Sequence, residues 1–190
     1  MLSAASERQL FHTRQISCAG YLRADGLWDI EAHITDTKTH DFRTAAQTIV
    51  APGQPVHEMR LRLTIDDDLL IRSAEAVTEH GPSPECQAIN GRYAQLQGMQ
   101  IGPGFLAKAR QLLSGVEACT HLTELIAPLA TTAMQTLSHK FKAAEQQRLA
   151  LLNKAPGVKP KPQLVDSCHT FRSDGPVVAK LWPDSYTGAS

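Results

Sequence analysis

The sequence has no excess of either charge. Lysine plus arginine and aspartate plus glutamate both number 19 in 190 residues, so the formal net charge is zero when histidine is neutral. A protein that binds nucleic acid independently of base sequence needs a surplus of positive charge to neutralise the phosphates. We therefore expect no nucleic-acid partner.

Long apolar stretches are also missing. No run approaches the roughly 18 residues typical of a membrane-spanning helix. Residues 1–7 lack the basic and apolar blocks of a secretory signal peptide. We therefore expect a cytoplasmic protein without a membrane partner. Its four widely spaced cysteines should then be reduced, which favours metal ligands or core residues over disulfides.

Short motifs that identify a cofactor by themselves are absent as well. The sequence has no Cys-x-x-Cys pair. The run Ile101-Gly-Pro-Gly-Phe105 lacks the third glycine and the preceding strand of a dinucleotide-binding loop, so it indicates a turn. Any metal site must therefore be assembled by the fold from residues far apart in the chain.

What is present begins with an alternating pattern typical of β-strands. The Asp25-Gly26 pair accepts positive φ and predicts a tight turn between two strands. A polar loop over residues 37–54 follows the second strand. The four expected strands span residues 12–23, 27–35, 56–66 and 69–78. The pattern predicts an antiparallel meander with one apolar face.

The polar side of this sheet carries the first candidate site. Alternation places Asp29, Glu31 and His33 on one face of the second strand, opposite Arg60 and Arg62 of the third. Glu31 or His33 could act as catalytic acid or base, while Asp29, Arg60 and Arg62 bind a substrate. The alternative is cross-strand ion pairing on the wet face of a one-sided sheet.

Beyond Gly81 the spacing of the apolar residues changes from every second residue to about every 3.6 residues, which predicts helices. We expect them at residues 84–96, 104–114 and 120–153. The last helix becomes polar after Ser138, which favours a solvent-exposed segment or an arm for homo-oligomerisation. The predicted architecture is α+β, with the helices of residues 84–153 covering one face of the sheet.

The C-terminal part should be separate from this domain. Residues 155–162 are rich in proline and lysine and predict an extended linker. Residues 164–190 resemble a β-hairpin, with Trp182 and Tyr186 packing back on the body. The expected organisation is therefore one domain over 1–153, a linker over 154–163 and a C-terminal segment over 164–190.

Three cysteines, Cys86, Cys119 and Cys168, stand where predicted elements begin. Cys119 and His121 lie two residues apart at the start of the longest predicted helix, where free backbone N–H groups favour a thiolate. The alternative is that each cysteine is simply a buried core residue.

Two thiols and two imidazoles are the smallest set that closes a tetrahedral metal site, and zinc or iron would suit them. The expected ligands are Cys119, His121, Cys168 and His169, with Cys86 and His57 in reserve. If residues 168 and 169 lie in a strand, their side chains point to opposite faces and only one can bind the ion.

Several runs resemble an uncharacterised bacterial family that carries a domain of unknown function. They are His12-Thr-Arg14, Asp25-Gly-Leu-Trp-Asp-Ile-Glu31, Pro55-Val-His57, Leu61-Arg-Leu-Thr64, Cys119-Thr-His-Leu-Thr-Glu-Leu125 and Ser167-Cys-His169. The resemblance implies a proteobacterial protein encoded near genes for the degradation of aromatic compounds. It implies no activity.

A more distant similarity is to iron–sulfur scaffold proteins of the NifU-like type. In that family one cysteine follows the last strand, a second opens a helix and a His-Cys pair comes later. Cys86, Cys119 and the Cys168-His169 pair occur in that order, although the pair is reversed. The small residues usual around the scaffold cysteines are missing, and Pro84-Glu85 precedes the first cysteine in place of a glycine-rich loop. The similarity therefore implies a related fold but not cluster assembly, and a metal-binding or iron–sulfur scaffold is one hypothesis for the function.

These observations favour a metal-assisted enzyme, a lyase or hydrolase, that acts on a small aromatic metabolite. Given the gene neighbours that the resemblance implies, a carbon–carbon lyase releasing formaldehyde from a lignin-derived compound is one such enzyme. The alternatives are the iron–sulfur or metal scaffold, and an accessory subunit of a catabolic enzyme. Metal content discriminates among them, because a scaffold should be coloured and a zinc enzyme colourless.

Overall fold

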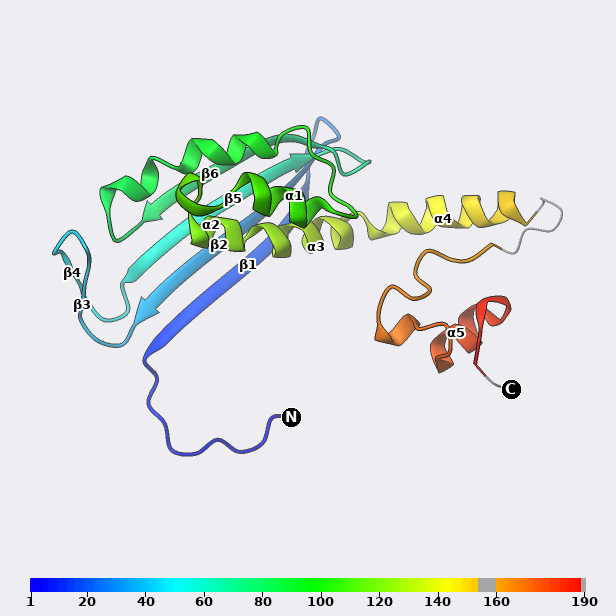
Figure 1. The fold of residues 1–190 in the computed structure, drawn as a ribbon, viewed down its shortest axis with the longest axis horizontal. Coiled ribbons are helices and arrows are strands. Elements are labelled where there is room, and N and C mark those ends of the chain that lie inside the picture. The colour runs from blue at the N-terminus through cyan, green and yellow to red at the C-terminus, as the bar shows by residue number, and fades with distance from the viewer. Residues whose placement is uncertain (154–159, 189–190) are drawn as a thin grey trace. The chain divides into compact units, whose positions relative to one another are not determined.

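The computed structural model describes residues 1–153 and 160–188 of the chain (Figure 1). The chain divides into two compact units, Met1–Thr136 and Leu137–Ser190. Most of the predicted linker, residues 154–159, lies outside the described residues. None of the described helices combines the length and apolar character needed to cross a membrane.

A four-stranded antiparallel sheet forms the frame of the first unit. Its strands are β1 (His12–Leu22), β2 (Trp28–Lys38), β5 (Pro55–Ile65) and β6 (Ile71–His80). They lie in the order β1-β2-β5-β6, which confirms the predicted meander. The predicted loop between β2 and β5 contains a small hairpin of β3 (Phe42–Arg43) and β4 (Ile49–Val50).

Alternation in the central strands decides which face of the sheet is buried. In β2 the even-numbered residues from Trp28 to Ile34 are at most 7% exposed, and the odd-numbered residues between them are partly exposed. In β5 Met59, Leu61, Leu63 and Ile65 continue the same buried layer. We call this side the covered face and the opposite side the open face, because no described helix of the first unit lies on it.

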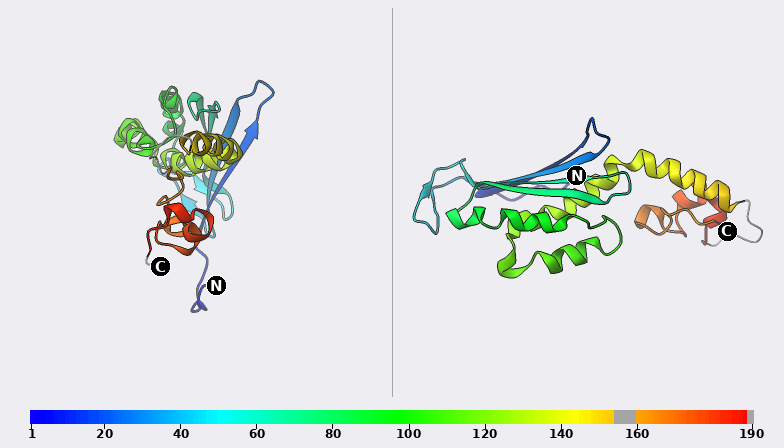
Figure 2. Two further views of the ribbon diagram at one scale, coloured as in Figure 1. Left: turned by 90° about the vertical axis from the view of Figure 1, so that its right-hand side faces the viewer. Right: turned by 90° about the horizontal axis from the view of Figure 1, so that it is seen from above.

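Helical segments after β6 cover one face of the sheet, as the right panel of Figure 2 shows. They are η1 (Pro84–Gln87), η2 (Asn90–Leu96), α1 (Phe105–Leu112), η3 (Gly115–Glu117), α2 (Thr120–Glu124) and α3 (Ile126–Thr136). The α+β prediction is thus confirmed. The predicted α-helix over 84–96 is instead two 3₁₀ segments, in a stretch where Asn90 and Gly91 are weak helix formers.

The long helix expected over 120–153 is divided into α2, α3 and α4 (Ser138–Leu152). The first break falls at Leu125, and Pro128 explains it. Proline has no N–H to donate, and its ring would meet the carbonyl of Glu124, four residues earlier. The helix therefore restarts, with Pro128 in the first turn of α3. The second break, at Leu137, coincides with the boundary between the two units.

The second unit contains α4, η4 (His169–Phe171), α5 (Pro176–Leu181) and η5 (Pro183–Ser185). No strand occurs among residues 160–188, so the predicted C-terminal hairpin is wrong. Pro176 occupies the first turn of α5, where its fixed φ suits a helix. In α4, Arg148 donates to the carbonyl of Lys161 at 2.7 Å, and Glu145 accepts from the N–H of Gln163 at 2.8 Å. Residues 161–163 are therefore anchored to α4.

Candidate functional site

A buried carboxylate ends the apolar series of β2. Asp36 follows Ile34 in the even-numbered positions, so its side chain points to the covered face, where it is 1% exposed. In the register of the sheet, Asp36 lies opposite Arg14 of β1 and opposite His57 of β5. Strand pairing thus sets an arginine, an aspartate and a histidine in one row across three strands.

Arg14 compensates the charge of Asp36. Its Nε and Nη2 donate to the two carboxylate oxygens at 2.8 and 2.7 Å, and its Nη1 donates to Glu124 of α2 at 2.5 Å. His12 adds a contact of 3.2 Å from Nε2 to Oδ1 of Asp36. A buried charge needs such partners, because an unpaired carboxylate in an apolar interior costs several kcal/mol or more.

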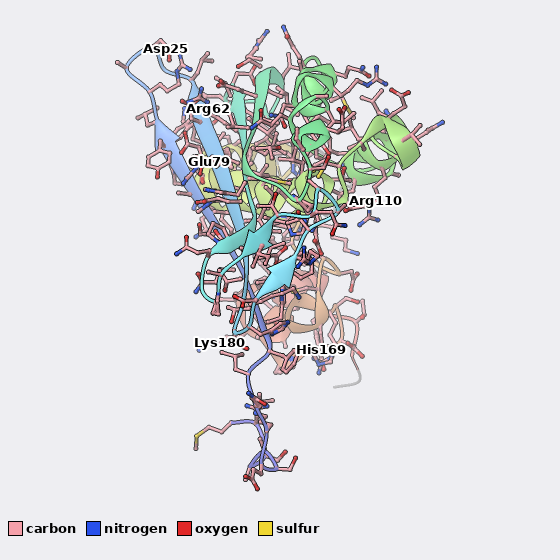
Figure 3. All side chains as sticks on the ribbon, turned by 90° about the vertical axis from the view of Figure 1, so that its left-hand side faces the viewer. Asp25, Arg62, Glu79, Arg110, His169 and Lys180 are labelled. Atoms are coloured by element: carbon pink, nitrogen blue, oxygen red, sulfur yellow. The ribbon has the colours of Figure 1, made fainter. Side chains whose placement is uncertain are left out.

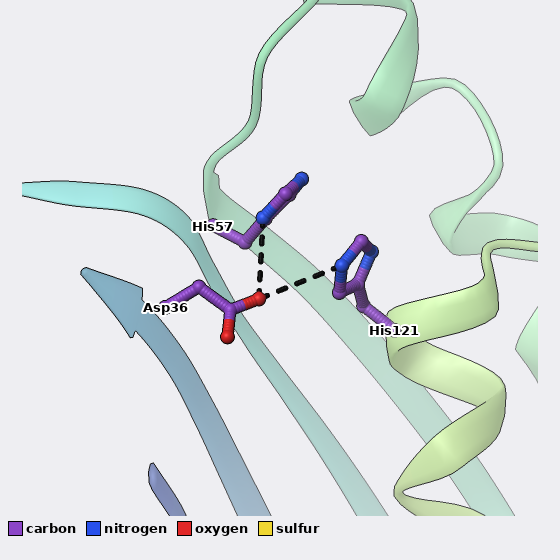
Figure 4. Close-up of side chains that lie close together, drawn as sticks. All are labelled: Asp36, His57 and His121. Atoms are coloured by element: carbon purple, nitrogen blue, oxygen red, sulfur yellow. Dashed lines mark ion pairs between the residues drawn. The ribbon is translucent and has the colours of Figure 1, made fainter. Parts of the chain in front are cut away.

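Two histidines converge on the other side of the same carboxylate. Figure 4 shows His57 from β5 and His121 from α2 turned toward one oxygen of Asp36. The distances to Oδ2 are 3.2 Å from Nδ1 of His57 and 3.5 Å from Nε2 of His121. The imidazole rings stack, with centroids 3.8 Å apart. Nδ1 of His57 is buried and has no hydrogen-bond partner among the described residues, because its contact with Asp36 is not aligned for one.

Electrostatics favours neutral imidazoles and an ionised carboxylate. Burial lowers the pKa of His57, and the neighbouring His121 lowers it further. Burial also lowers the pKa of His121, as does the positive charge of Arg14. Burial alone would raise the pKa of Asp36, but the hydrogen bonds and the positive charge of Arg14 outweigh it and bring the pKa below its ordinary value. Neutral imidazoles can bind a metal ion or accept a proton.

The backbone just before His121 is held by hydrogen bonds to a buried tyrosine. Tyr93 of η2 is fully buried, and its hydroxyl donates to the carbonyl of Cys119 at 2.8 Å. The same hydroxyl accepts from the N–H of Cys119 at 3.1 Å and lies 2.8 Å from Oγ1 of Thr123. Sγ of Cys119 lies 3.9 Å from Nδ1 of His121. The start of α2, and with it the direction of His121, is therefore fixed by a buried hydroxyl.

His57, Cys119 and His121 line a cleft of about 540 Å³ between the beginning of β5, η1 and the η3–α2 turn. We call it the histidine cleft. Its lining contains no lysine or arginine, and most of it is apolar. The lining residues are His57, Met59, Pro82, Glu85, Cys86, Ala88, Ile89, Val116, Ala118, Cys119, Thr120 and His121. A cleft of this size and character suits a small, mainly apolar molecule.

The structure brings together four of the six predicted metal ligands. Cys86, Cys119, His57 and His121 all line the histidine cleft. Cys168 and His169 belong to the second unit, where Cys168 is exposed and precedes η4. Their participation in a site with Cys119 stays a prediction.

Sequence reasoning missed Asp36, Arg14 and His12. The signal for Asp36 was available in the alternation of β2. The predicted strand ended at residue 35, whereas continuing the pattern by one step puts a carboxylate on the apolar face. The contacts of Arg14 and His12 had no comparable signal, because they depend on the register between β1 and β2.

The predicted acid–base and substrate-binding residues lie on the open face. Figure 3 shows Arg62 on the side of the sheet away from Arg110 of the helical layer. His33 lies 2.9 Å from Glu58, Arg60 donates to Glu79 at 2.8 Å, and Arg62 pairs with Glu75. Glu31 lies 3.6 Å from Arg62, and Asp29 accepts from the hydroxyl of Thr64 at 2.6 Å.

The sheet separates these side chains from the histidine cleft. Glu31 and His33 therefore cannot act on a substrate held by His57 and His121 on the covered face.

A family model described as a protein of unknown function (DUF2889) matches residues 12–135. No curated protein and no solved structure matches the chain. The matched range includes Arg14, Asp36, His57 and His121 and ends before α4, so it excludes Cys168 and His169. The similarity to NifU-like scaffolds and the implied gene neighbours stay predictions.

Proposed function

Because the chain belongs to the DUF2889 family, whose function is unknown, we propose an activity from the site alone: a metal-assisted enzyme that acts on a small uncharged molecule in the histidine cleft. The observation that carries this proposal is the convergence of Asp36, His57 and His121. Their donor atoms all lie within 4.8 Å of one another.

The spacing of these donors fits a metal ion. Bonds of about 2.0–2.1 Å to a tetrahedral ion place two ligand atoms about 3.3 Å apart. The carboxylate oxygen of Asp36 lies 3.2 Å from His57 and 3.5 Å from His121. An ion among these atoms would also give the buried Nδ1 of His57 the partner that the described residues do not supply.

Two histidines and one carboxylate leave coordination positions open, as catalytic sites for zinc or ferrous iron do. Such an ion polarises a substrate oxygen or activates a bound water. Within the chain, Arg14 orients the carboxylate of Asp36, and Cys119 lies beside the second nitrogen of His121, where a residue that orients a metal ligand is usually found. Arg14, Asp36 and Glu124 together carry a charge of −1 (+1 −1 −1), which favours a cation.

The cleft supports an uncharged and largely apolar substrate. None of its lining residues is a lysine or arginine that could pair with a carboxylate or phosphate, and Glu85 contributes a negative charge. An aromatic ring bearing a hydroxyl or carbonyl oxygen has this chemistry. The site does not specify the reaction. The gene neighbours that the family resemblance implies favour a carbon–carbon lyase that releases formaldehyde from such a compound, and we propose that reaction first.

Metal analysis of the purified protein tests this function. We expect about one zinc or iron ion per chain after dialysis, and none in His57→Ala or His121→Ala. His139→Ala, on α4, is the matched control and should keep the ion. His169→Ala tests the predicted ligand in the second unit. Equal metal content in all four variants, or no metal in the wild type, would refute the proposal.

A second candidate is acid–base catalysis without a metal, and the two hydrogen bonds from Arg14 favour it. Both oxygens of Asp36 already accept from the guanidinium, which competes with a cation for the same carboxylate. The neutral pair His57 and His121 could then exchange protons with a substrate in the cleft. Activity that survives a chelator and is lost in His121→Ala would support this alternative.

A further inference from the structure

An irregularity in β6 sets two neighbouring side chains on the same side of the sheet. Met59 pairs with Thr78, but Glu58 pairs with His80, so Glu79 has no opposite residue. Strict alternation would send Glu79 and His80 to opposite faces. A β-bulge removes this constraint, and both residues contact open-face side chains: Glu79 meets Arg60 at 2.8 Å, and His80 meets Glu58 at 2.9 Å.

The bulge completes a group of metal-ligating side chains from three neighbouring strands. The members are His33 of β2, Glu58 of β5, and Glu79 and His80 of β6. One oxygen of Glu58 lies 2.9 Å from Nε2 of His33, and the other lies 2.9 Å from Nδ1 of His80. Donor atoms of His33, Glu58 and Glu79 lie within 4.8 Å of one another.

We propose that this group, the bulge site, binds a second divalent transition-metal ion on the open face. His33, Glu58 and Glu79 are the ligands on which the ion is first held, and His80 joins by a small side-chain rotation. Imidazole together with carboxylate suits zinc, nickel or cobalt. Calcium and magnesium favour sites made of oxygen ligands alone.

The bulge site should bind more weakly than the histidine cleft. Glu58 is 19% and Glu79 is 36% exposed, whereas Asp36 is 1% exposed, so water competes more strongly for the ion. Arg60 also competes, because it donates to Glu79 and lies 4.0 Å from Glu58. Counting these three side chains, the net charge is −1 (+1 −1 −1), which still attracts a cation. We expect an exchangeable ion that dialysis removes.

Isothermal titration calorimetry of the dialysed wild-type protein with Ni²⁺ at neutral pH tests the proposal. We expect about one equivalent to bind beyond any ion retained in the histidine cleft. Binding should weaken by at least about tenfold in His33→Ala and in Glu58→Gln. His139→Ala, outside the site, should bind as the wild type does. Thermal unfolding of each variant identifies one that fails to fold, and His80→Ala then serves as the second ligand variant.

Arg60→Gln separates a metal site from a plain network of ion pairs. If Glu79 and Glu58 bind an ion, removing the competing guanidinium should tighten Ni²⁺ binding several-fold. Absence of an additional equivalent, or binding that is unchanged in His33→Ala, Glu58→Gln and Arg60→Gln alike, would overturn the proposal. Since the histidine cleft lies on the opposite face, His121→Ala should leave the weaker equivalent in place.

Discussion

The two faces of one sheet use the same residue types with different consequences. On the covered face, Arg14, Asp36, His57 and His121 meet around a carboxylate that is 1% exposed. On the open face, arginines, glutamates and His33 form pairs whose members are mostly one-fifth to three-fifths exposed. Water screens the open-face pairs, so each contributes about 0–1 kcal/mol. Burial makes the covered-face cluster costlier to disturb.

The two faces should differ most in the free energy of unfolding that is lost when one arginine is removed from each. Arg14→Ala leaves the carboxylate of Asp36 buried without its main partner, and we expect a loss of about 2–4 kcal/mol in the free energy of unfolding, allowing for the partial exposure of Arg14. Arg62→Ala on the open face should cost less than about 1 kcal/mol. Urea denaturation measures both values. Equal losses would show that burial does not distinguish the two faces.

The pH dependence of stability should also be traceable to the covered face. The pKa values of His57 and His121 are lowered in the folded protein, so the unfolded chain binds protons more readily. The contribution of these two histidines to the free energy of unfolding is therefore fully present above the unfolded histidine pKa of about 6.5. It is lost as the pH drops from there toward the folded pKa.

A His57→Gln/His121→Gln protein, measured with chelator present, should lose less stability than the wild type between neutral and mildly acidic pH. The control is Tyr21→Phe at an exposed position of β1, which should follow the wild-type curve. The lowered pKa of Asp36 adds a second loss at lower pH, as the pH falls below the unfolded aspartate value of about 3.9. Parallel curves for all three proteins would contradict the assignment.

Removing the hydroxyl of Tyr93 should have a smaller effect. Tyr93→Phe keeps the buried ring but removes the hydroxyl that accepts from the N–H of Cys119 and donates to its carbonyl. The carbonyl still accepts from the N–H of Thr123 at 2.9 Å, so mainly the N–H loses its partner, and we expect a cost of about 1–2 kcal/mol. Because these bonds orient the turn before His121, metal affinity in the histidine cleft should fall as well. Tyr21→Phe, at an exposed tyrosine of β1, is the control and should change neither thermal stability nor metal content.

The smallest effect is expected at Glu75 on the open face. Glu75→Gln removes the partner of Arg62 in a pair whose side chains are 44% and 60% exposed. Arg62 retains Glu31 at 3.6 Å. We expect a change within about 0.5 kcal/mol by thermal unfolding. A loss as large as that of Tyr93→Phe would mean that another part of the protein buries this face.

The sequence by itself determined the sheet, its meander order and the residues of its two faces. Alternation is a local property, so Ile30, Ile34 and Leu61 could be assigned to the core without knowledge of their neighbours. The breaks between the helices were harder to predict from the sequence. Pro128 explains why α2 ends before it. The sequence prediction nevertheless continued the helix through Pro128, because apolar residues recur with a helical period on both sides of it. In the C-terminal unit, short apolar runs suited a strand or a helix equally, and the structure has helices.

Only the tertiary structure decided which polar side chains meet. Arg14, Asp36 and His57 share a row because of the register between strands that are some 20 residues apart in the chain, and no local pattern encodes that register. His121 reaches the same carboxylate from a helix whose start is held by Tyr93. The bulge that brings Glu79 and His80 together is equally invisible in a regular alternation. Residue types are local, whereas a site requires distances between segments, and those come from packing.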